Sequence, residues 1–228
     1  MVAYLLSISN TDKAHLPDFH LKYGILKDTP LHISCRCGHI QTIYLLLQAT
    51  NHELDSNYLI ETNADGLTAF HLSVYHEHIH VIQCFIDTLD ESTLHKITST
   101  KDTVHNETPL IYAINKGYDV SFIQILASVS DLNLSSVDVP PLVVATKRND
   151  IETAQALLFL DIDINQTDDL GHTAISIAAR NGYADLCELL ASHGADLMIT
   201  TQRGGTPLQK AKRYKHLNVV KILEKYGG

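Results

Sequence analysis

Two short stretches hold the residues whose types and spacing could do chemistry. Residues 35–39, CRCGH, place two thiols one residue apart with a His two residues on, and residues 75–80, YHEHIH, hold three His side chains. Thiolates and imidazoles are ligands that zinc prefers, and a thiolate is also a nucleophile. A tetrahedral zinc site needs four converging ligands. The other thiols, Cys84 and Cys187, are distant in the sequence, so the surrounding elements decide whether any ligands converge.

The elements that position these residues follow a repeat. A tetrad related to Thr-Pro-Leu recurs six times, and successive copies lie 39, 40, 32, 33 and 33 residues apart. After each tetrad come a small residue, a Gly or its substitute, and a helical run that ends in leucines. Such a period is typical of stacked repeat proteins. The tetrads are TPLH at 29–32, TAFH at 68–71, TPLI at 108–111, PPLV at 140–143, TAIS at 173–176 and TPLQ at 206–209.

The pattern resembles the ankyrin repeat. In that family TPLH opens a first helix, Gly-His separates it from a second helix, and GAD with a distal D-x-x-G forms a projecting turn. Here Asp161, Ile162 and Asp163 stand at the GAD positions, and Asp168 and Gly171 supply the turn. The resemblance implies an all-α ankyrin-repeat solenoid of stacked helix-turn-helix units with projecting turns.

Elementary helix chemistry agrees with this resemblance. A Thr before a helix is a good N-cap, Pro is tolerated in the first turn, and Gly provides the left-handed residue that closes a short helix. Neither helix of a pair can hide its apolar face alone, so the pairs stack and share a continuous core. The expected N-caps are Thr29, Thr68, Thr108, Thr173 and Thr206, and the expected left-handed glycines are Gly38, Gly117 and Gly182.

The tetrad His is present in only two copies, as His32 and His71. The resemblance implies that this His forms hydrogen bonds between repeats, so we expect those bonds in repeats 1 and 2 and not in repeats 3 to 6.

The resemblance divides the chain into an N-terminal capping segment, residues 1–26, and an ankyrin-repeat domain, residues 27–228. The repeats are expected at about 27–64, 65–104, 105–137, 138–169, 170–202 and 203–228. The connections after repeats 1 and 2 exceed a 33-residue period by six or seven residues. We expect them to lengthen the second helix or add a short turn, and to form larger projecting loops.

The repeat register changes the meaning of the two opening stretches. Cys35 falls at a small-residue position and is expected to be buried, whereas Cys37 is expected near the surface. His78 is a turn residue, and His76 and His80 flank it across a helix break, so the three share no helical face. We therefore predict no metal, no cofactor and no catalytic residues, and we expect that the protein is not an enzyme.

Composition and charge bound the remaining possibilities. The chain has 228 residues, 45% of them hydrophobic, and a net charge of -9. It has no run of the roughly 18 apolar residues that a membrane span needs, and its start lacks the pattern of a secretory signal. We therefore expect a monomeric, cytoplasmic protein without a membrane contact. Nucleic acid is an unfavourable partner because binding it requires Lys and Arg to neutralise phosphates.

The candidate binding surface also follows from the resemblance, because ankyrin proteins hold partners with variable positions of their first helices. At these positions no residue is acidic, and repeats 3 to 6 carry several Lys and Arg. The alternative is that cations simply favour the C-terminal ends of helices. The candidate partner-binding residues are Arg36, Tyr75, His76, Tyr112, Asn115, Lys116, Lys147, Arg148, Arg180, Asn181, Arg213 and Tyr214.

These residues predict a non-catalytic scaffold that binds an acidic or phosphorylated segment of another protein on its concave face. Charge reversal at Lys147, Arg148 and Arg180 is expected to abolish binding and to leave the fold intact. Two alternatives remain. The chain could be the substrate-targeting half of a larger enzyme or ubiquitin-ligase adaptor whose catalytic or recruiting domain lies outside it, or the same surface could bind RNA.

The degenerate repeats and 14 His residues resemble the ankyrin proteins that intracellular bacteria secrete as effectors into the host-cell cytosol. If the protein meets an animal cytosol, residues 157–165 resemble the acceptor pattern of an asparaginyl hydroxylase, which makes Asn165 a candidate for hydroxylation.

Overall fold

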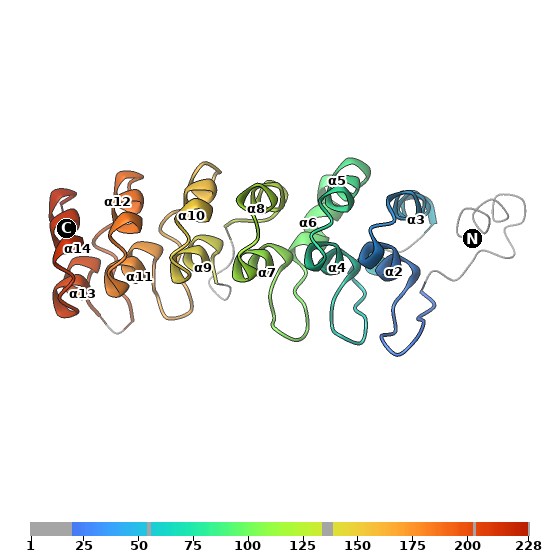
Figure 1. The fold of residues 1–228 in the computed structure, drawn as a ribbon, viewed down its shortest axis with the longest axis horizontal. Helices are drawn as coiled ribbons and strands as arrows, with labels where there is room; N and C mark the ends of the chain where they lie inside the picture. The colour runs from blue at the N-terminus through green and yellow to red at the C-terminus, as the bar shows by residue number, and fades with distance from the viewer. Residues whose placement is uncertain (1–19, 54–55, 134–138, 203, 228) are drawn as a thin grey trace, which may run out of the picture. The chain divides into compact units, whose positions relative to one another are not determined.

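The computed structural model describes residues 20–53, 56–133, 139–202 and 204–227. The chain forms two compact units, residues 1–113 and 114–228. Within the described residues every regular element is a helix, and the extended pairs are isolated bridges, Tyr23 with Asp28 and Thr62 with Thr68. Helices follow one another in pairs joined by short turns, so the all-α ankyrin-repeat fold predicted from the sequence is confirmed (Figure 1).

The helices of unit 1 are α2 (Pro30–Cys37), α3 (Ile40–Glu53), the 3-10 helix η2 (Ser56–Ile60), α4 (Ala69–Tyr75), α5 (Ile79–Thr88) and α6 (Glu91–Ser99). Helix α7 (Pro109–Lys116) crosses the boundary between the units. The helices of unit 2 are α8 (Val120–Ala127), α9 (Pro141–Lys147), α10 (Ile151–Leu158), α11 (Ala174–Asn181), α12 (Ala184–Ser192), α13 (Pro207–Arg213) and α14 (Leu217–Lys225). These helix bounds do not test the predicted repeat boundaries, which stay a prediction.

The predicted caps begin the first helices. Each Thr hydroxyl accepts a hydrogen bond from the backbone N–H three residues later, which satisfies one of the unpaired donors at a helix start. Helix α9 is different because its N-cap residue is Pro140, whose side chain has no atom that can accept a hydrogen bond. The capping residues are Thr29, Thr68, Thr108, Thr173 and Thr206.

Left-handed residues end the first helices, as predicted. Gly182 has a φ of 80°, and a Cβ added there would lie 2.6 Å from the His216 ring, so the position requires Gly for both its backbone and its space. The equivalent residues Glu77, Asn149 and Lys215 have φ of 54°, 57° and 63° although they carry side chains. A side chain is strained in this region of the backbone map.

The two tetrad His residues join neighbouring repeats, as predicted. His71 Nδ1 lies 2.7 Å from the Thr68 hydroxyl, and its Nε2 lies 3.2 Å from the Glu107 carbonyl oxygen before the next tetrad. His32 makes the same contacts with Thr29 and the Leu67 carbonyl, at 2.7 and 3.1 Å. Burial lowers the pKa of His71 to about 4, although the Glu107 carbonyl opposes this shift.

The core lies between helices of successive repeats. In unit 1, α2 packs on α4 and α3 packs on α5, and Phe70 meets Phe85 edge to face with ring centres 5.2 Å apart. In unit 2, α9, α11 and α13 pack in succession, and so do α10, α12 and α14, with Leu157, Leu186 and Leu223 fully buried between them. First helices therefore line one side of each unit and second helices the other (Figure 1).

The two long connections are more ordered than expected. Helix α3 extends to Glu53, as one of the expected outcomes required, and η2 follows it. The second connection forms a further helix, α6, which Asp90 caps and which packs on η2 through buried side chains that include Leu94 and Ile97. The added residues of both connections therefore form helices within unit 1, and the expectation of larger projecting loops stays a prediction.

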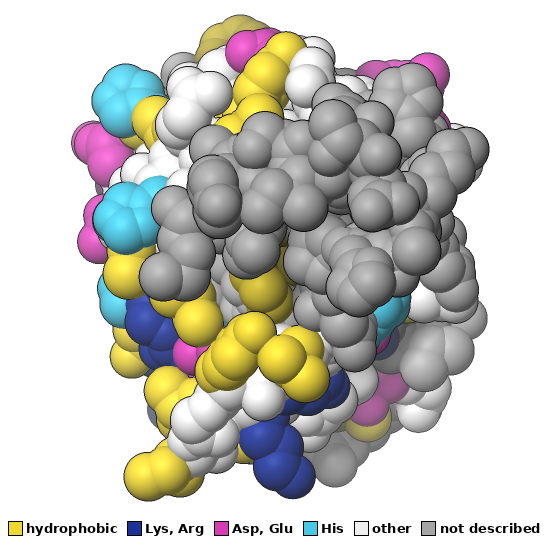
Figure 2. Space-filling view, turned by 90° about the vertical axis from the view of Figure 1, so that its right-hand side faces the viewer, with side chains coloured by type: hydrophobic (Ala, Val, Ile, Leu, Met, Phe, Trp, Pro, Cys, Tyr) yellow, Lys and Arg dark blue, Asp and Glu magenta, His cyan; other side chains and the backbone are white. Residues whose placement is uncertain are grey.

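The predicted N-terminal cap lies largely outside the described residues. In the part that is described, Leu21, Tyr23 and Ile25 are exposed beside Lys22 and Lys27. Figure 2, which faces this side of the chain, shows hydrophobic side chains next to Lys and Arg side chains. None of the helices in the described residues is both long and apolar enough to span a bilayer.

Candidate partner-binding surface

Two of the candidate residues of unit 1 stack on each other. The Tyr75 ring is half exposed and lies 5.7 Å from the Tyr112 ring, centre to centre. Tyr112 itself is only 6% exposed, so it supports Tyr75 and offers a partner little surface of its own. His76 is exposed and meets Tyr75 edge to face at 5.1 Å. Tyr75 and His76 are therefore the accessible side chains of this aromatic cluster.

Arg36 in unit 1 already has a carboxylate partner. Its guanidinium donates to Asp28 at 2.8 Å, and the other oxygen of Asp28 accepts a hydrogen bond from Asn63 at 2.8 Å. Asp28 is buried, so it holds Arg36 in place. Much of the charge of Arg36 is matched within the chain, which weakens its appeal to an acidic partner.

A recurring hydrogen bond joins the end of one first helix to the next repeat, and the sequence did not predict it. His78 Nε2 contacts the Arg36 carbonyl oxygen and His216 Nε2 contacts the Arg180 carbonyl oxygen, both at 3.0 Å. In unit 2 Arg148 donates instead to the Asn115 carbonyl oxygen. These side chains pair carbonyl groups that a helix end leaves without an intrahelical partner. Arg148 therefore has a structural task as well as an exposed surface.

Lys147 lies beside a buried acid. Its ammonium is 3.2 Å from Asp168, whose side chain is 2% exposed, and His172 Nδ1 is 3.1 Å from the same carboxylate. Burial alone would raise the pKa of Asp168, but hydrogen bonds from the His172 backbone N–H and from Lys147 lower it on balance. No candidate position holds an acid in the sequence, but Asp168 of a later turn lies against Lys147.

The remaining candidates of unit 2 are exposed. Arg180 and Asn181 end α11, and Arg213 and Tyr214 end α13, where the Tyr214 ring stacks on His216 at 6.4 Å. No ion pair holds Arg180 or Arg213 within the described residues. Asn115 and Lys116, at the end of α7, are also exposed.

Lys147, Arg180 and Arg213 occupy one helical position, the seventh residue after the N-cap, and we call them the basic row. They stand on α9, α11 and α13, which pack in succession in unit 2. Among the described residues, Asp168 is the one carboxylate that forms an ion pair with a member of the row. The row can attract an anionic partner, because Arg180 and Arg213 have no ion pair within the described residues and cations on neighbouring helices sum their potentials.

The buried thiols are poor nucleophiles in this fold. Cys35 and Cys187 are fully buried, and burial raises the pKa of Cys187 to about 12. Cys37 is exposed, as predicted, and Cys84 is mostly buried. A thiol acts as a nucleophile only after it loses its proton, so the buried thiols are structural side chains.

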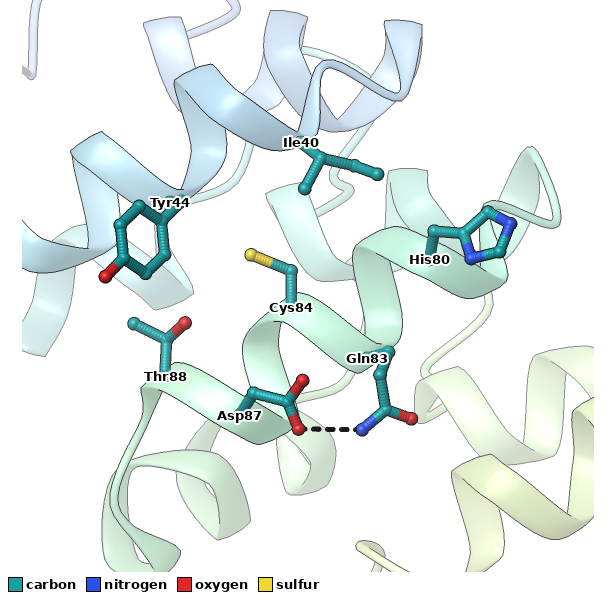
Figure 3. A pocket seen from close by; sticks show the side chains of 7 residues that line it. All are labelled: Ile40, Tyr44, His80, Gln83, Cys84, Asp87 and Thr88. Carbon is teal, nitrogen blue, oxygen red and sulfur yellow. Dashed lines mark hydrogen bonds between the residues drawn. The ribbon is translucent and has the colours of Figure 1, made fainter.

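An open hollow of about 390 Å³ lies in unit 1 between α3 and α5 (Figure 3). Ile40 and Tyr44 of α3 face Cys84 of α5 across it, and Asp87 accepts a hydrogen bond from Gln83 at its rim. Burial raises the pKa of the Cys84 thiol, so this thiol is not an activated nucleophile. Within the described part of the chain no three His, Cys, Asp or Glu side chains gather as metal ligands.

Asn165 lies in a turn, and its side chain forms a hydrogen bond with the backbone of the next turn. Its side-chain oxygen accepts a hydrogen bond from the Asp196 backbone N–H at 2.8 Å. Asn133, 32 residues earlier, does the same for the Asp163 backbone N–H at 2.8 Å. The turns of unit 2 are thus linked side by side, and hydroxylation of Asn165 stays a prediction.

These features define a helical-repeat binding protein, in which stacked helix pairs form a core and exposed ends of first helices form a surface. The family model for ankyrin repeats (3 copies) matches residues 1–90 and 142–228. The chain belongs to the ankyrin-repeat family. Ankyrin repeats indicate a protein–protein interaction module, and both the fold and the relatives are those of ankyrin-repeat proteins.

Relatives and solved structures support this assignment. The chain is 26% identical over 121 residues to a putative ankyrin repeat protein of Borreliella burgdorferi, which covers 53% of this chain and 49% of that protein. It is 24% identical over 200 residues to the B-cell lymphoma 3 protein homolog of Mus musculus, which covers 86% of this chain and 42% of that protein. The chain thus spans half or less of the length of these curated relatives.

A solved ankyrin repeat domain from Acinetobacter baumannii AYE superposes with a TM-score of 0.69 at 24% identity. The superposition covers 87% of this chain and 97% of the solved domain, and it shows the shared fold.

Proposed function

We propose that unit 2 binds an acidic or phosphorylated segment of another protein along the ends of α9, α11 and α13. The observation that carries this proposal is the basic row: Lys147, Arg180 and Arg213 stand on three neighbouring helices, and one carboxylate is recorded against them. The net charge of the whole chain is -9. A local cationic row on an acidic protein favours one orientation for an anionic partner.

The residue types suit this task. An Arg guanidinium can donate two parallel hydrogen bonds to a carboxylate or a phosphate, which adds geometry to attraction. Tyr214 is half exposed beside Arg213 and offers a rigid, amphipathic ring of the kind that anchors interfaces. The partner segment would therefore carry negative charges, and an apolar side chain near Tyr214 would add affinity.

The structure changes which variants should test the proposal. A Glu at position 147 would lie against buried Asp168, and a Glu at position 148 would lose the bond to the Asn115 carbonyl oxygen. Charge reversal at Lys147 and Arg148 is therefore a poor test of binding, because it also removes contacts within the chain. The double variant R180E/R213E avoids both problems because no ion pair is recorded for either Arg in the described residues.

The experiment probes an array of acidic, phosphorylated, neutral and basic peptides with the full chain, with R180E/R213E and with K221E. Lys221 is an exposed residue of α14, a second helix, and serves as the matched control. We expect wild type and K221E to select acidic and phosphorylated peptides, and R180E/R213E to lose them. Equal selection by all three proteins, or a preference for neutral peptides, would contradict the proposal.

The cellular setting is a separate proposal. Location in a cytosol, delivery into a host cell as a bacterial effector, and service as the targeting part of a larger enzyme or ubiquitin-ligase adaptor all stay predictions from the sequence. Mass spectrometry of the chain after incubation with an asparaginyl hydroxylase tests the role of Asn165, and an unmodified Asn165 would dispose of it.

A further inference from the structure

Lys210 of α13 carries a buried ammonium without a hydrogen-bond acceptor. The residue is 9% exposed, and its Nζ atom has no partner among the described residues. Buried charges in proteins are ordinarily paired, because removal from water costs several kcal/mol. A buried ammonium with no acceptor among the described residues points to an acceptor on a bound ligand.

The position of Lys210 makes this more unusual. It is the fourth residue after the N-cap of its helix, and the same position holds Val144 in α9 and Ile177 in α11. Both are buried apolar side chains, 5% and 6% exposed. Packing at this helical position therefore favours an apolar residue, and the Lys at 210 does not add to stability.

The charged groups that act on Lys210 are one cation, Arg180, and one anion, Asp168. Burial lowers the pKa of Lys210, the Arg180 guanidinium lowers it further, and the Asp168 carboxylate raises it. Asp168 is already shared by the Lys147 ammonium at 3.2 Å and the His172 ring at 3.1 Å. Since Lys147, Arg180 and Lys210 carry three positive charges against one on Asp168, two positive charges remain unmatched when His172 is neutral.

We propose that Arg180 and Lys210 form a site for a phosphate group on the bound segment, a statement that rests on the proposed function of the basic row. A phosphate monoester carries about -1.5 to -2 charges near neutral pH, which matches the two unmatched cations, whereas a carboxylate carries one. Its oxygens accept paired hydrogen bonds from Arg180, which is exposed. Rotation about the flexible stem of Lys210 turns the buried Nζ toward the same oxygens.

The test uses the full chain with isotope-labelled lysines and follows the Lys210 resonance by NMR. Inorganic phosphate, acetate and chloride are titrated separately at equal ionic strength, so that phosphate and carboxylate chemistry are separated from screening. The variants are K210M, R180M and the exposed control K221M. Met suits position 210 because it keeps an unbranched apolar stem next to a row that holds Val144 and Ile177.

We expect phosphate to shift the wild-type Lys210 resonance saturably. Binding should weaken roughly tenfold or more in R180M, because one charge-assisted contact is lost. K210M has no Lys210 resonance to follow, so its binding is measured by the rise in melting temperature that phosphate causes. We expect this rise to be lost in K210M. K221M should bind as wild type does. Without phosphate, K210M should melt at a higher temperature than wild type, because an unpaired buried charge has been removed.

Three results would overturn the site. A linear shift with no saturation would mean screening alone, an equal response to acetate would assign a carboxylate, and a lower melting temperature of K210M without ligand would mean that the ammonium already has a stabilising partner. The outcome is separable from that of the peptide array. Acidic peptides lost by R180E/R213E together with no saturable phosphate would sink this site alone, whereas saturable phosphate with no peptide preference would sink the proposed function alone.

Discussion

His71 should make unit 1 sensitive to acid. The side chain is 2% exposed, and burial lowers its pKa from the ordinary value of 6.5 to about 4. The unfolded chain therefore takes up a proton near pH 6.5, while the folded chain resists it until about pH 4. Because the unfolded state binds more protons in this window, stability falls as pH falls from 6.5 toward 4, and this group causes no further loss below that.

The magnitude follows from the two pKa values. They differ by about 2.5, and one pKa unit corresponds to about 1.36 kcal/mol, so protonation of His71 removes on the order of 3 kcal/mol of the free energy of unfolding. His32 acts in the same direction, since burial lowers its pKa also. Total stabilities of domains are about 5–15 kcal/mol. Loss of this size is therefore measurable well before the chain unfolds.

The assay is urea unfolding followed by circular dichroism at about pH 7.5 and about pH 5, where the window of His71 lies. His71→Gln is the informative variant, because the native Gln209 occupies the same helical position in α13. At the higher pH the variant should lose about 1 kcal/mol with the bond to the Glu107 carbonyl. Wild type should then lose more stability than the variant on acidification.

The control is His80→Gln, which alters an exposed His of α5. It should follow the wild-type pH dependence. The reasoning would be refuted if wild type and His71→Gln lost equal stability between the two pH values, since the buried ring would then titrate as an ordinary His does.

Three further predictions concern single residues. Lys215→Gly should raise the free energy of unfolding by about 0.5–1 kcal/mol, because Lys215 holds a φ of 63° that favours Gly; an unchanged thermal midpoint would contradict this. Asp168→Asn should destabilise unit 2 by about 1–3 kcal/mol in urea unfolding, because the Lys147 ammonium loses the charge of a carboxylate that is 2% exposed. The pKa of Asp168 is lowered by folding, so this contribution should fade as pH falls below about 4, and persistence at lower pH would count against it. In thiol labelling of the native protein, Cys37 should react first and Cys35 only on unfolding, whereas equal rates would show that α2 opens readily.

The sequence predicted the elements best where the signal is local. Thr29 and Thr206 begin helices, and Gly38 and Gly182 end them. Both kinds of cap were predictable because they depend only on residues within one helical turn. Asp90 before ESTL is a local signal of the same kind, and it begins α6. An N-cap followed by an apolar pair would have predicted this helix, although the ankyrin pattern does not include it.

Contacts between repeats were harder to predict. His78, His216 and Arg148 bond to helix-end carbonyls of the preceding repeat, and no spacing within one repeat indicates that. Asp168 was predicted as a turn residue, but its ion pair with Lys147 depends on how the turn folds against α9. For the same reason the candidate partner-binding residues include both cations that are paired within the chain and cations that are not.

The buried charge of Lys210 shows a different limit. A sequence pattern does not reveal whether a Lys ammonium finds an acceptor in the fold. Burial and the surrounding charges, which only the fold supplies, turn an ordinary Lys into the centre of a candidate phosphate site.

The central claim is that the basic row of unit 2 holds a negatively charged partner segment. The most direct measurement is the affinity of one array-selected acidic or phosphorylated peptide, by fluorescence anisotropy, for wild type, K221E and R180E/R213E. We predict equal affinity for wild type and K221E, and a loss of roughly a hundredfold for R180E/R213E, because two attractive charges become repulsive ones. Equal affinity for all three proteins would contradict the claim.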